Sequence, residues 1–261
     1  IYIGLPLGIV FALALVGTVA LALTNPRSST QASQVGFLAA IAASRRLDGR
    51  VAVVRTRADI RPPKSHLLNR VLHRRGADLI SAAAGFMTAE YAAVGVDGER
   101  VRVIHPGVVV DRFVPGSASE AAAQLRASLP GPRGRLVGVV GRLTAVKGHA
   151  VFIDAAARLA ERLPDAGFVI SGEEWDVPRA GLEERAEGHG IADRVYFLDR
   201  LPDVRPLLEA LDVVVVASTG SEAVSRIALE AMALARPVVA TSVGSLPELL
   251  ADGAGVLVPP G

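Results

Sequence analysis

Apolar and polar residues follow one another along most of the chain in blocks that predict strands alternating with helices. Short, almost continuously apolar runs predict strands at 51–57, 79–84, 101–105, 136–140, 167–171, 195–198, 213–217, 237–241 and 255–258. Apolar residues that recur at helical spacing predict helices at 35–43, 65–75, 88–93, 119–128, 149–163, 179–188, 204–210, 222–234 and 246–250. This order of elements is typical of an α/β fold.

The segment 213–217 indicates how the sheet of the second half is covered. Its sequence is VVVVA, in which no polar residue alternates with the apolar ones. A strand of this kind is buried on both faces, as strands are in parallel sheets that carry helices on both sides. We therefore predict a parallel sheet between two layers of helices.

The first 26 residues form an uncharged, apolar segment that the strand and helix pattern does not include. A helix needs about 20 apolar residues to cross a bilayer, and this segment is long enough. Arg27, Arg45 and Arg46 follow it, so a membrane anchor would leave the rest of the chain in the cytoplasm. A buried element of an incomplete first domain is the alternative, because Gly4 and Pro6 weaken a helix.

Changes in composition divide the rest of the chain into two domains. We predict a partial, Rossmann-like N-terminal domain over 27–116 and a second domain over 136–261. The segment 117–135, which ends in several Pro and Gly residues, is predicted to be a linker. The first domain lacks early strand and helix units, and the second ends before the helices that would close it, so we expect both to be shortened.

Composition excludes several kinds of site. The chain has no Cys, which rules out disulfides, thiolate zinc sites and a Cys nucleophile. The net charge is only +2, yet residues 45–75 contain ten Lys/Arg and two Asp. This basic stretch is either a solvated face, a phosphate-binding region or a contact with an anionic membrane. Nucleic acid is not expected as a partner, because no aromatic residues for stacking lie among the charges.

Ligands of parallel α/β sheets bind beyond the carboxyl ends of the strands, so the loops that follow strands are the places to look for chemistry. After the strand 136–140 comes a glycine-bounded loop that contains Arg142 and Lys147. Two cations on such a loop can converge on a diphosphate, although they can also be two surface cations. His105 and His149 lie on such loops, whereas His66, His73 and His189 are predicted to lie at the surface.

The loop after 213–217 leads into a helix that contains two glutamates. Small residues at 218–221 leave the first helix amides free, and these amides attract phosphate. Glu222 is predicted at the mouth of this helix and Glu230 two turns further along. A carboxylate can accept hydrogen bonds from two vicinal sugar hydroxyls, although Glu222 can also simply stabilise the helix dipole.

These segments together resemble a known family. EAVSRIALEAMALARPVVATSVGSLPELL (222–250), GRLTAVKGH (141–149) and VRVIHPGVVVDRFVPG (101–116) are similar to retaining glycosyltransferases of family 4, the Glu-x7-Glu type. The resemblance implies a GT-B fold of two Rossmann-like parallel-sheet domains, with the N-terminal, acceptor-side domain incomplete here. The domain 136–261 would then bind a nucleotide-sugar donor.

The resemblance also assigns roles to residues. It implies that Glu222 is catalytic and approaches the donor sugar, and that Glu230 binds the ribose. The other donor-binding residues that it implies are Gly141, Arg142, Lys147, Gly172, Arg200, Leu201, Ser225, Arg226 and Ile227. It implies neither a cofactor nor a metal, because cations and amides neutralise the diphosphate. Glu173 and Glu174 depart from the family pattern, which has a second glycine close to Gly172.

The function implied is transfer of a sugar, with retention, from a nucleotide-sugar to a glycan, lipid-linked or cell-envelope acceptor. The location implied is the cytoplasm or the cytoplasmic face of the membrane. A truncated or degenerate relative that binds nucleotide without turnover is one alternative. An epimerase or phosphorylase of the same two-domain build is another, which the Glu-x7-Glu segment does not favour.

Overall fold

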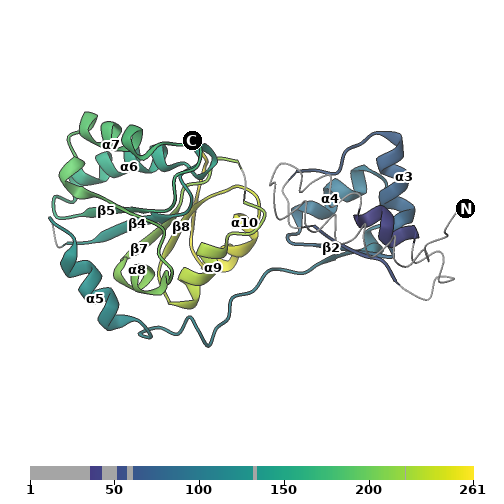
Figure 1. The fold of residues 1–261 in the computed structure, drawn as a ribbon, viewed down its shortest axis with the longest axis horizontal. Coiled ribbons are helices and arrows are strands. Elements are labelled where there is room, and N and C mark those ends of the chain that lie inside the picture. Colours follow the sequence, from purple (N-terminus) through teal and green to yellow (C-terminus); the bar gives the residue numbers. More distant parts are fainter. Residues whose placement is uncertain (1–35, 43–51, 58–60, 132–133, 221) are drawn as a thin grey trace, which may run out of the picture. The chain divides into compact units, whose positions relative to one another are not determined.

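The computed structural model describes residues 36–42, 52–57, 61–131, 134–220 and 222–261. The chain divides into two compact units, Ile1–Ile104 and His105–Gly261 (Figure 1). The predicted anchor at 1–26 lies outside the described residues. Within the described ranges, no helix combines the length and the apolar character needed to cross a bilayer.

Unit 1 contains a small parallel sheet with helices. Its strands are β1 (Val54–Arg57), β2 (Leu79–Ala82) and β3 (Val101–Val103), in the spatial order β1-β2-β3. Its helices are 36–42, α3 (Leu67–Gly76), α4 (Phe86–Ala93) and the 3-10 turn η1 (Gly98–Arg100). The predicted elements are all present, with ends shifted by up to three residues.

His73 is buried inside unit 1, whereas its sequence context predicts a surface residue. Asn69, His73 and Gly76 are the buried positions of α3, and their spacing places them on one face of the helix. The His73 ring stacks on Phe37 and meets Tyr91 edge-on, at centroid distances of 6.4 and 5.6 Å. Burial, with smaller contributions from nearby arginines, lowers the pKa of His73 to about 4. The imidazole is therefore a neutral core residue at neutral pH.

Unit 2 contains a parallel sheet of six strands, in the spatial order β6-β5-β4-β7-β8-β9. The strands are β4 (Leu136–Val140), β5 (Gly167–Ser171), β6 (Val195–Leu198), β7 (Val213–Val216), β8 (Val238–Thr241) and β9 (Val256–Val258). The helices are α5 (Ser119–Ser128), α6 (His149–Arg162), α7 (Arg179–Gly188), α8 (Arg205–Ala210), α9 (Arg226–Ala233) and α10 (Leu246–Leu249). The 3-10 turns are η2 (Ala145–Lys147), η3 (Ala192–Arg194) and η4 (Ala251–Gly253).

Two apolar cores cover the two faces of this sheet, as the VVVVA run predicts. One core contains residues of α8, α9 and α10, and the other contains residues of α6 and α7. In β7, Val214 and Val216 belong to the first core, while Val215 packs against the second. Figure 1 shows the sheet between these helix layers.

The strand order reverses direction between β4 and β7, and this reversal locates the crevice of the sheet. From β4 the chain proceeds outward to β5 and β6, and it then returns to β7 on the other side of β4. The loops after β4 and β7 therefore leave neighbouring strands at the same edge and diverge. Such switch points are where open α/β sheets bind ligands.

The segment 117–135 is part of unit 2, whereas the sequence predicted it to be an inter-domain linker. It includes α5, which packs on α8. The buried Glu209 of α8 accepts hydrogen bonds from Ala118 N (3.0 Å) and Ser119 Oγ (3.2 Å), and Arg126 pairs with Asp212 at 3.1 Å. These long-range contacts fix the segment, so the units divide after Ile104 and not at 116.

Candidate functional site

The loop after β4 is fixed by the loop after β5. Leu143 N donates to Glu173 O (2.8 Å), and Ala145 N donates to the carboxylate of Asp176 (3.0 Å). At the base of the two loops the backbones touch, because a Cβ on Gly172 would lie 1.9 Å from Gly141 O. Only glycine fits at residue 172. The backbone that carries Arg142 and Lys147 is thus well defined.

Gly148 brings the same loop against the end of β7. It has φ +69° and lies between η2 and α6. A Cβ at this position would lie 2.0 Å from Ala217 O, so the backbones of the two loops pack directly on each other. Lys147 therefore lies at the switch point between β4 and β7.

Glu222 meets Lys147 at this point. The Lys147 ammonium pairs with the Glu222 carboxylate, whose side chain is 2% exposed. Ser218 Oγ donates a second hydrogen bond to the same carboxylate oxygen, at 2.6 Å. The backbone carbonyl of Glu222 accepts a hydrogen bond from Ser245 N (2.7 Å). Gly244 packs against the same carbonyl, because a Cβ added to Gly244 would collide with it. Loops after three neighbouring strands thus fix Glu222, those after β4 and β7 through its carboxylate and that after β8 through its backbone carbonyl.

The helix that follows begins later than the sequence predicts. The predicted helix starts at Glu222, whereas α9 starts at Arg226. The Glu222 carbonyl is bonded to Ser245, and Ser225 has non-helical dihedrals, φ −90° and ψ 84°. Glu222 accordingly lies in the loop before the helix and not at its mouth, and the residues at the mouth are Ser225–Ile227.

The N-terminus of α9 has the features of an anion site. The first amides of a helix lack partners within it, and among the described residues no side chain caps those of α9. In the same part of the structure, the buried Oγ atoms of Ser225 and Ser245 have no hydrogen-bond partner. Free amides, hydroxyls and the helix dipole favour a negatively charged group.

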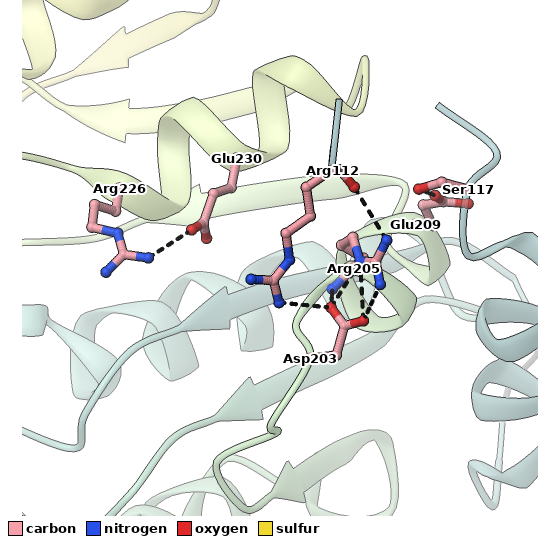
Figure 2. Close-up of polar contacts among 7 residues, drawn as sticks. All are labelled: Arg112, Ser117, Asp203, Arg205, Glu209, Arg226 and Glu230. Atoms are coloured by element: carbon pink, nitrogen blue, oxygen red, sulfur yellow. Dashed lines mark hydrogen bonds and ion pairs between the residues drawn. The ribbon is translucent and has the colours of Figure 1, made fainter. Parts of the chain in front are cut away.

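Glu230 lies one helical turn further, at a separate pocket. Its side chain is 11% exposed, and it accepts a hydrogen bond from Arg226 at 3.2 Å (Figure 2). The pocket has a volume of about 420 Å³ and combines charged groups with an apolar wall. It is lined by Gly107, Val108, Val109, Arg112, Phe113, Leu201, Pro202, Val204, Arg226 and Glu230.

The structure separates the remaining predicted donor residues. Leu201, Arg226 and Glu230 share the pocket just described, whereas Gly172 and Arg200 line another cavity of about 330 Å³. Three carboxylates, those of Glu173, Glu174 and Asp199, also line this second cavity, which makes it a poor place for a phosphate. The Arg142 guanidinium lies over the exposed ring of Trp175, 5.1 Å from its centroid.

His149 supports the loop rather than facing a ligand. It is 2% exposed, and its Nε2 lies 3.3 Å from Gly141 O. Burial lowers the pKa of His149. The hydrogen bond to Gly141 opposes this shift, and the charge of Lys147 adds to it.

The sequence did not single out Ser218 or Ser245 as site residues. Both follow strands of the sheet, so the rule that ligands bind at carboxyl ends of strands could have identified them.

A family comparison decides what this second unit is. Residues 134–261 match the family described as Glycosyl transferases group 1. They form a group 1 glycosyltransferase domain. Lys147, Glu222, Ser225 and Glu230, the residues of the switch point and of α9, all belong to this domain.

Curated relatives of the glycosyltransferase domain share its sequence over a limited length. The D-inositol 3-phosphate glycosyltransferase of Corynebacterium urealyticum is 38% identical over 169 residues, which is 61% of this chain and 39% of the relative. The enzyme of the same name from Mycobacteroides abscessus is 41% identical over 174 residues, 62% of this chain and 36% of the relative. The chain thus spans about two fifths of the length of these relatives.

Solved structures agree with the fold. Anabaena HepE in complex with UDP and glucose superposes with a TM-score of 0.72 and 27% identity, over 88% of this chain and 62% of that one. The C-terminal domain of LpcC from Francisella tularensis, a group 1 glycosyl transferase, gives a TM-score of 0.51 and 32% identity over 59% of this chain and 80% of that one. The fold of this chain is of the GT-B type, as its sequence resemblance implies.

Proposed function

We propose that the chain takes part in retaining glycosyl transfer of the family 4 type, from a nucleotide-sugar donor to a glycan, lipid-linked or cell-envelope acceptor. The observation that carries the proposal is the pairing of Lys147 with Glu222 at the β4/β7 switch point, in the loop that leads into the uncapped start of α9. A cation, a carboxylate and free amides there match the diphosphate and the sugar of such a donor.

The proposed roles follow from these positions. The α9 amides, Lys147 and Arg142 bind the diphosphate and stabilise the charge that develops on it as the sugar leaves, without a metal or cofactor. Glu222 faces the donor sugar, and Glu230 accepts hydrogen bonds from the ribose in the neighbouring pocket. Lys147 is paired with Glu222 in the free protein, and its ammonium has three N–H donors, so it can bond to a phosphate oxygen as well as to this carboxylate.

Uridine nucleotides are the first donors to test. HepE, which is 27% identical and has the same fold, was crystallised with UDP-glucose as well as with UDP and glucose. We expect UDP-sugars to stabilise the full chain by RT ln(1 + [L]/Kd), about 2.7 kcal/mol at a ligand concentration of 100 Kd. GDP- and ADP-sugars serve as the comparison panel. Trp175, the single tryptophan of the chain, reports binding by fluorescence because it stacks on Arg142.

Glu230 is expected to contribute directly to donor affinity. We expect Glu230→Gln to weaken UDP-sugar binding at least about 10-fold, because the amide loses the charge that strengthens hydrogen bonds to the ribose diol. Titration of the Trp175 fluorescence measures the change. Glu187→Gln, an exposed glutamate of α7, is the matched control and should bind like the wild type. Equal affinities of the Glu230 variant and the control would remove Glu230 from the site.

Binding without turnover is the second candidate. The placement of Lys147, Glu222 and Glu230 within residues 134–261 favours it, because one domain then holds the groups that binding needs, whereas transfer also needs an acceptor site. The two functions differ in one measurement, release of UDP from UDP-sugar in the presence and absence of acceptor. A Trp175 response without any UDP release would support a nucleotide-binding role, whereas acceptor-dependent release supports transfer.

We also propose that unit 1 contacts an anionic membrane surface, which would place the protein at the cytoplasmic face of a membrane. On α3, Leu67 and Leu68 are 79% and 76% exposed. Lys64, Arg70, Arg74 and Arg75 on or next to this helix are exposed too. Apolar side chains among cations are typical of helices that lie in a membrane interface.

Vesicle binding tests this surface. We expect the full chain with Leu67→Ser and Leu68→Ser to sediment less with vesicles that contain anionic lipid, and Arg70→Gln to lower binding further by about 1 kcal/mol. Leu163→Ser, which changes an exposed leucine of unit 2, is the control. Sedimentation is compared between variants of the full chain, all of which contain the apolar residues 1–26, so that a difference reports on α3 alone. Identical sedimentation of all variants would contradict a role of α3.

A further inference from the structure

The pocket beside Glu230 contains a cation to which the proposed donor roles assign no task. Arg112 belongs to the segment between β3 and α5, and its side chain lines the same pocket as Glu230. Figure 2 shows the Arg112 side chain extending into the space between Glu230 and Asp203. Its side chain is 55% exposed, so a ligand in the pocket can reach it.

Arg112 has a carboxylate nearby, but another arginine occupies that carboxylate. Arg205 Nε lies 3.0 Å from both oxygens of Asp203, and its Nη2 lies 2.6 Å from Oδ2. The Arg112 guanidinium forms an ion pair with Asp203 at 3.9 Å, which is too long for a hydrogen bond (Figure 2). The Asp203 acceptors are therefore used by Arg205, while the N–H groups of Arg112 can turn to a ligand.

Arg205 also fixes the position of Arg112. Its Nη1 donates a hydrogen bond of 3.2 Å to the backbone carbonyl of Arg112 (Figure 2). One arginine thus binds Asp203 and anchors the main chain from which Arg112 projects. The main chain from which the Arg112 side chain enters the pocket is therefore held in place without a ligand.

The surroundings of Arg112 define the chemistry of the group that it can bind. A guanidinium offers only donors, so its ligand has to supply acceptors. Apolar side chains of Val108, Phe113, Leu201 and Val204 line the same pocket, which suits a flat ring. A ring with carbonyl oxygens satisfies both conditions, and the ribose at Glu230 would place the donor's base here.

We propose that Arg112 is a specificity-determining residue that donates hydrogen bonds to carbonyl oxygens of the donor's base and favours uracil. The inference rests on the proposed function of this pocket as the nucleoside site. Uracil carries two carbonyl oxygens and one N–H donor. Guanine carries one carbonyl, and its N1–H and amino group need acceptors. The nearby carboxylate of Asp203 already accepts hydrogen bonds from Arg205. Adenine carries no carbonyl.

The test is titration of the full chain with UDP, GDP, ADP and inorganic pyrophosphate, followed by Trp175 fluorescence. We expect Arg112→Ala to weaken UDP binding about 10-fold or more, because a charged donor is lost, and to leave pyrophosphate binding unchanged. Arg112→Lys should not restore UDP binding, because an ammonium lacks the planar fork. Arg162→Ala, which removes an exposed arginine of α6, should bind all four ligands like the wild type.

The outcomes separate this inference from the proposed function. If the wild type binds UDP but Arg112→Ala weakens UDP, GDP and pyrophosphate equally, Arg112 acts on the phosphates and the inference is overturned. Full rescue by Arg112→Lys overturns it as well, because charge alone would suffice. If the wild type binds none of the four ligands, the donor site itself is wrong, and the inference falls with it.

Discussion

Replacing Lys147 by Met is expected to abolish the response of the chain to UDP-sugars and to destabilise unit 2. Binding is lost because the ammonium is the cation at the switch point, where the diphosphate is proposed to lie. Stability is lost because the carboxylate of Glu222, 2% exposed, remains buried without its partner. Breaking a buried pair from one side costs about 3 kcal/mol or more. Urea unfolding followed by Trp175 fluorescence measures the loss in unit 2, because no other tryptophan contributes.

A second substitution separates the two effects of Lys147. In the double variant Lys147→Met, Glu222→Gln the buried charge is absent, and the Gln amide can still bond to Ser218. We expect most of the lost stability to return, while the response to UDP-sugars stays absent. Recovery of nucleotide binding in the double variant would show that Lys147 acts only by neutralising Glu222 and not by binding the donor.

Replacing Gly148 by Ala is expected to have the second largest effect, because two backbones touch at this residue. The added Cβ would lie 2.0 Å from Ala217 O, so the loop after β4 has to move away from β7. Overpacking of this kind costs about 1–3 kcal/mol, and the left-handed backbone adds about 1 kcal/mol. We expect a loss of about 2–4 kcal/mol in the unfolding free energy of unit 2, measured in urea.

Gly190 supplies the matched control for Gly148. It has the same φ of +69°, and no atom lies within 4 Å of the position of an added Cβ. Gly190→Ala should therefore lower the unfolding free energy only by the cost of the left-handed backbone, about 1 kcal/mol. The difference between the two variants measures the contact between the loops. Equal losses would mean that the β4 loop relaxes freely, and that Lys147 is not held in position by β7.

The pattern of apolar residues predicts most of the architecture of unit 2. The strands 136–140, 167–171 and 195–198 begin and end where the sequence places them, and so do the helices 119–128 and 179–188. Local periodicity suffices here because each element buries one continuous apolar run or stripe. The loops after β4 and β7 can also be identified as the site from the sequence, because the carboxyl ends of parallel strands meet at one edge of the sheet.

Sequence reasoning fails where a contact between distant residues overrides a local pattern. A polar imidazole on a basic helix reads as a surface group, yet His73 is buried because Phe37 and Tyr91 enclose it. The Pro- and Gly-rich end of 117–135 suggests a linker, yet Glu209 and Asp212 tie this segment to unit 2. In both cases the partners lie far away in the sequence, so the residues next to His73 or next to 117–135 do not identify them.

The sequence by itself determined the α/β order of elements, the carboxyl-edge loops and the residue types there, because these follow from spacing along one segment. The tertiary structure decided the pairing of Lys147 with Glu222, the start of α9 at Arg226 and the presence of Arg112 in the pocket of Glu230. The pairing of Lys147 with Glu222 and the position of Arg112 bring together segments that lie more than 50 residues apart in the sequence. The late start of α9 depends on the hydrogen bond from Ser245 N to Glu222 O. Such contacts form only when the parallel sheet brings the ends of its strands together.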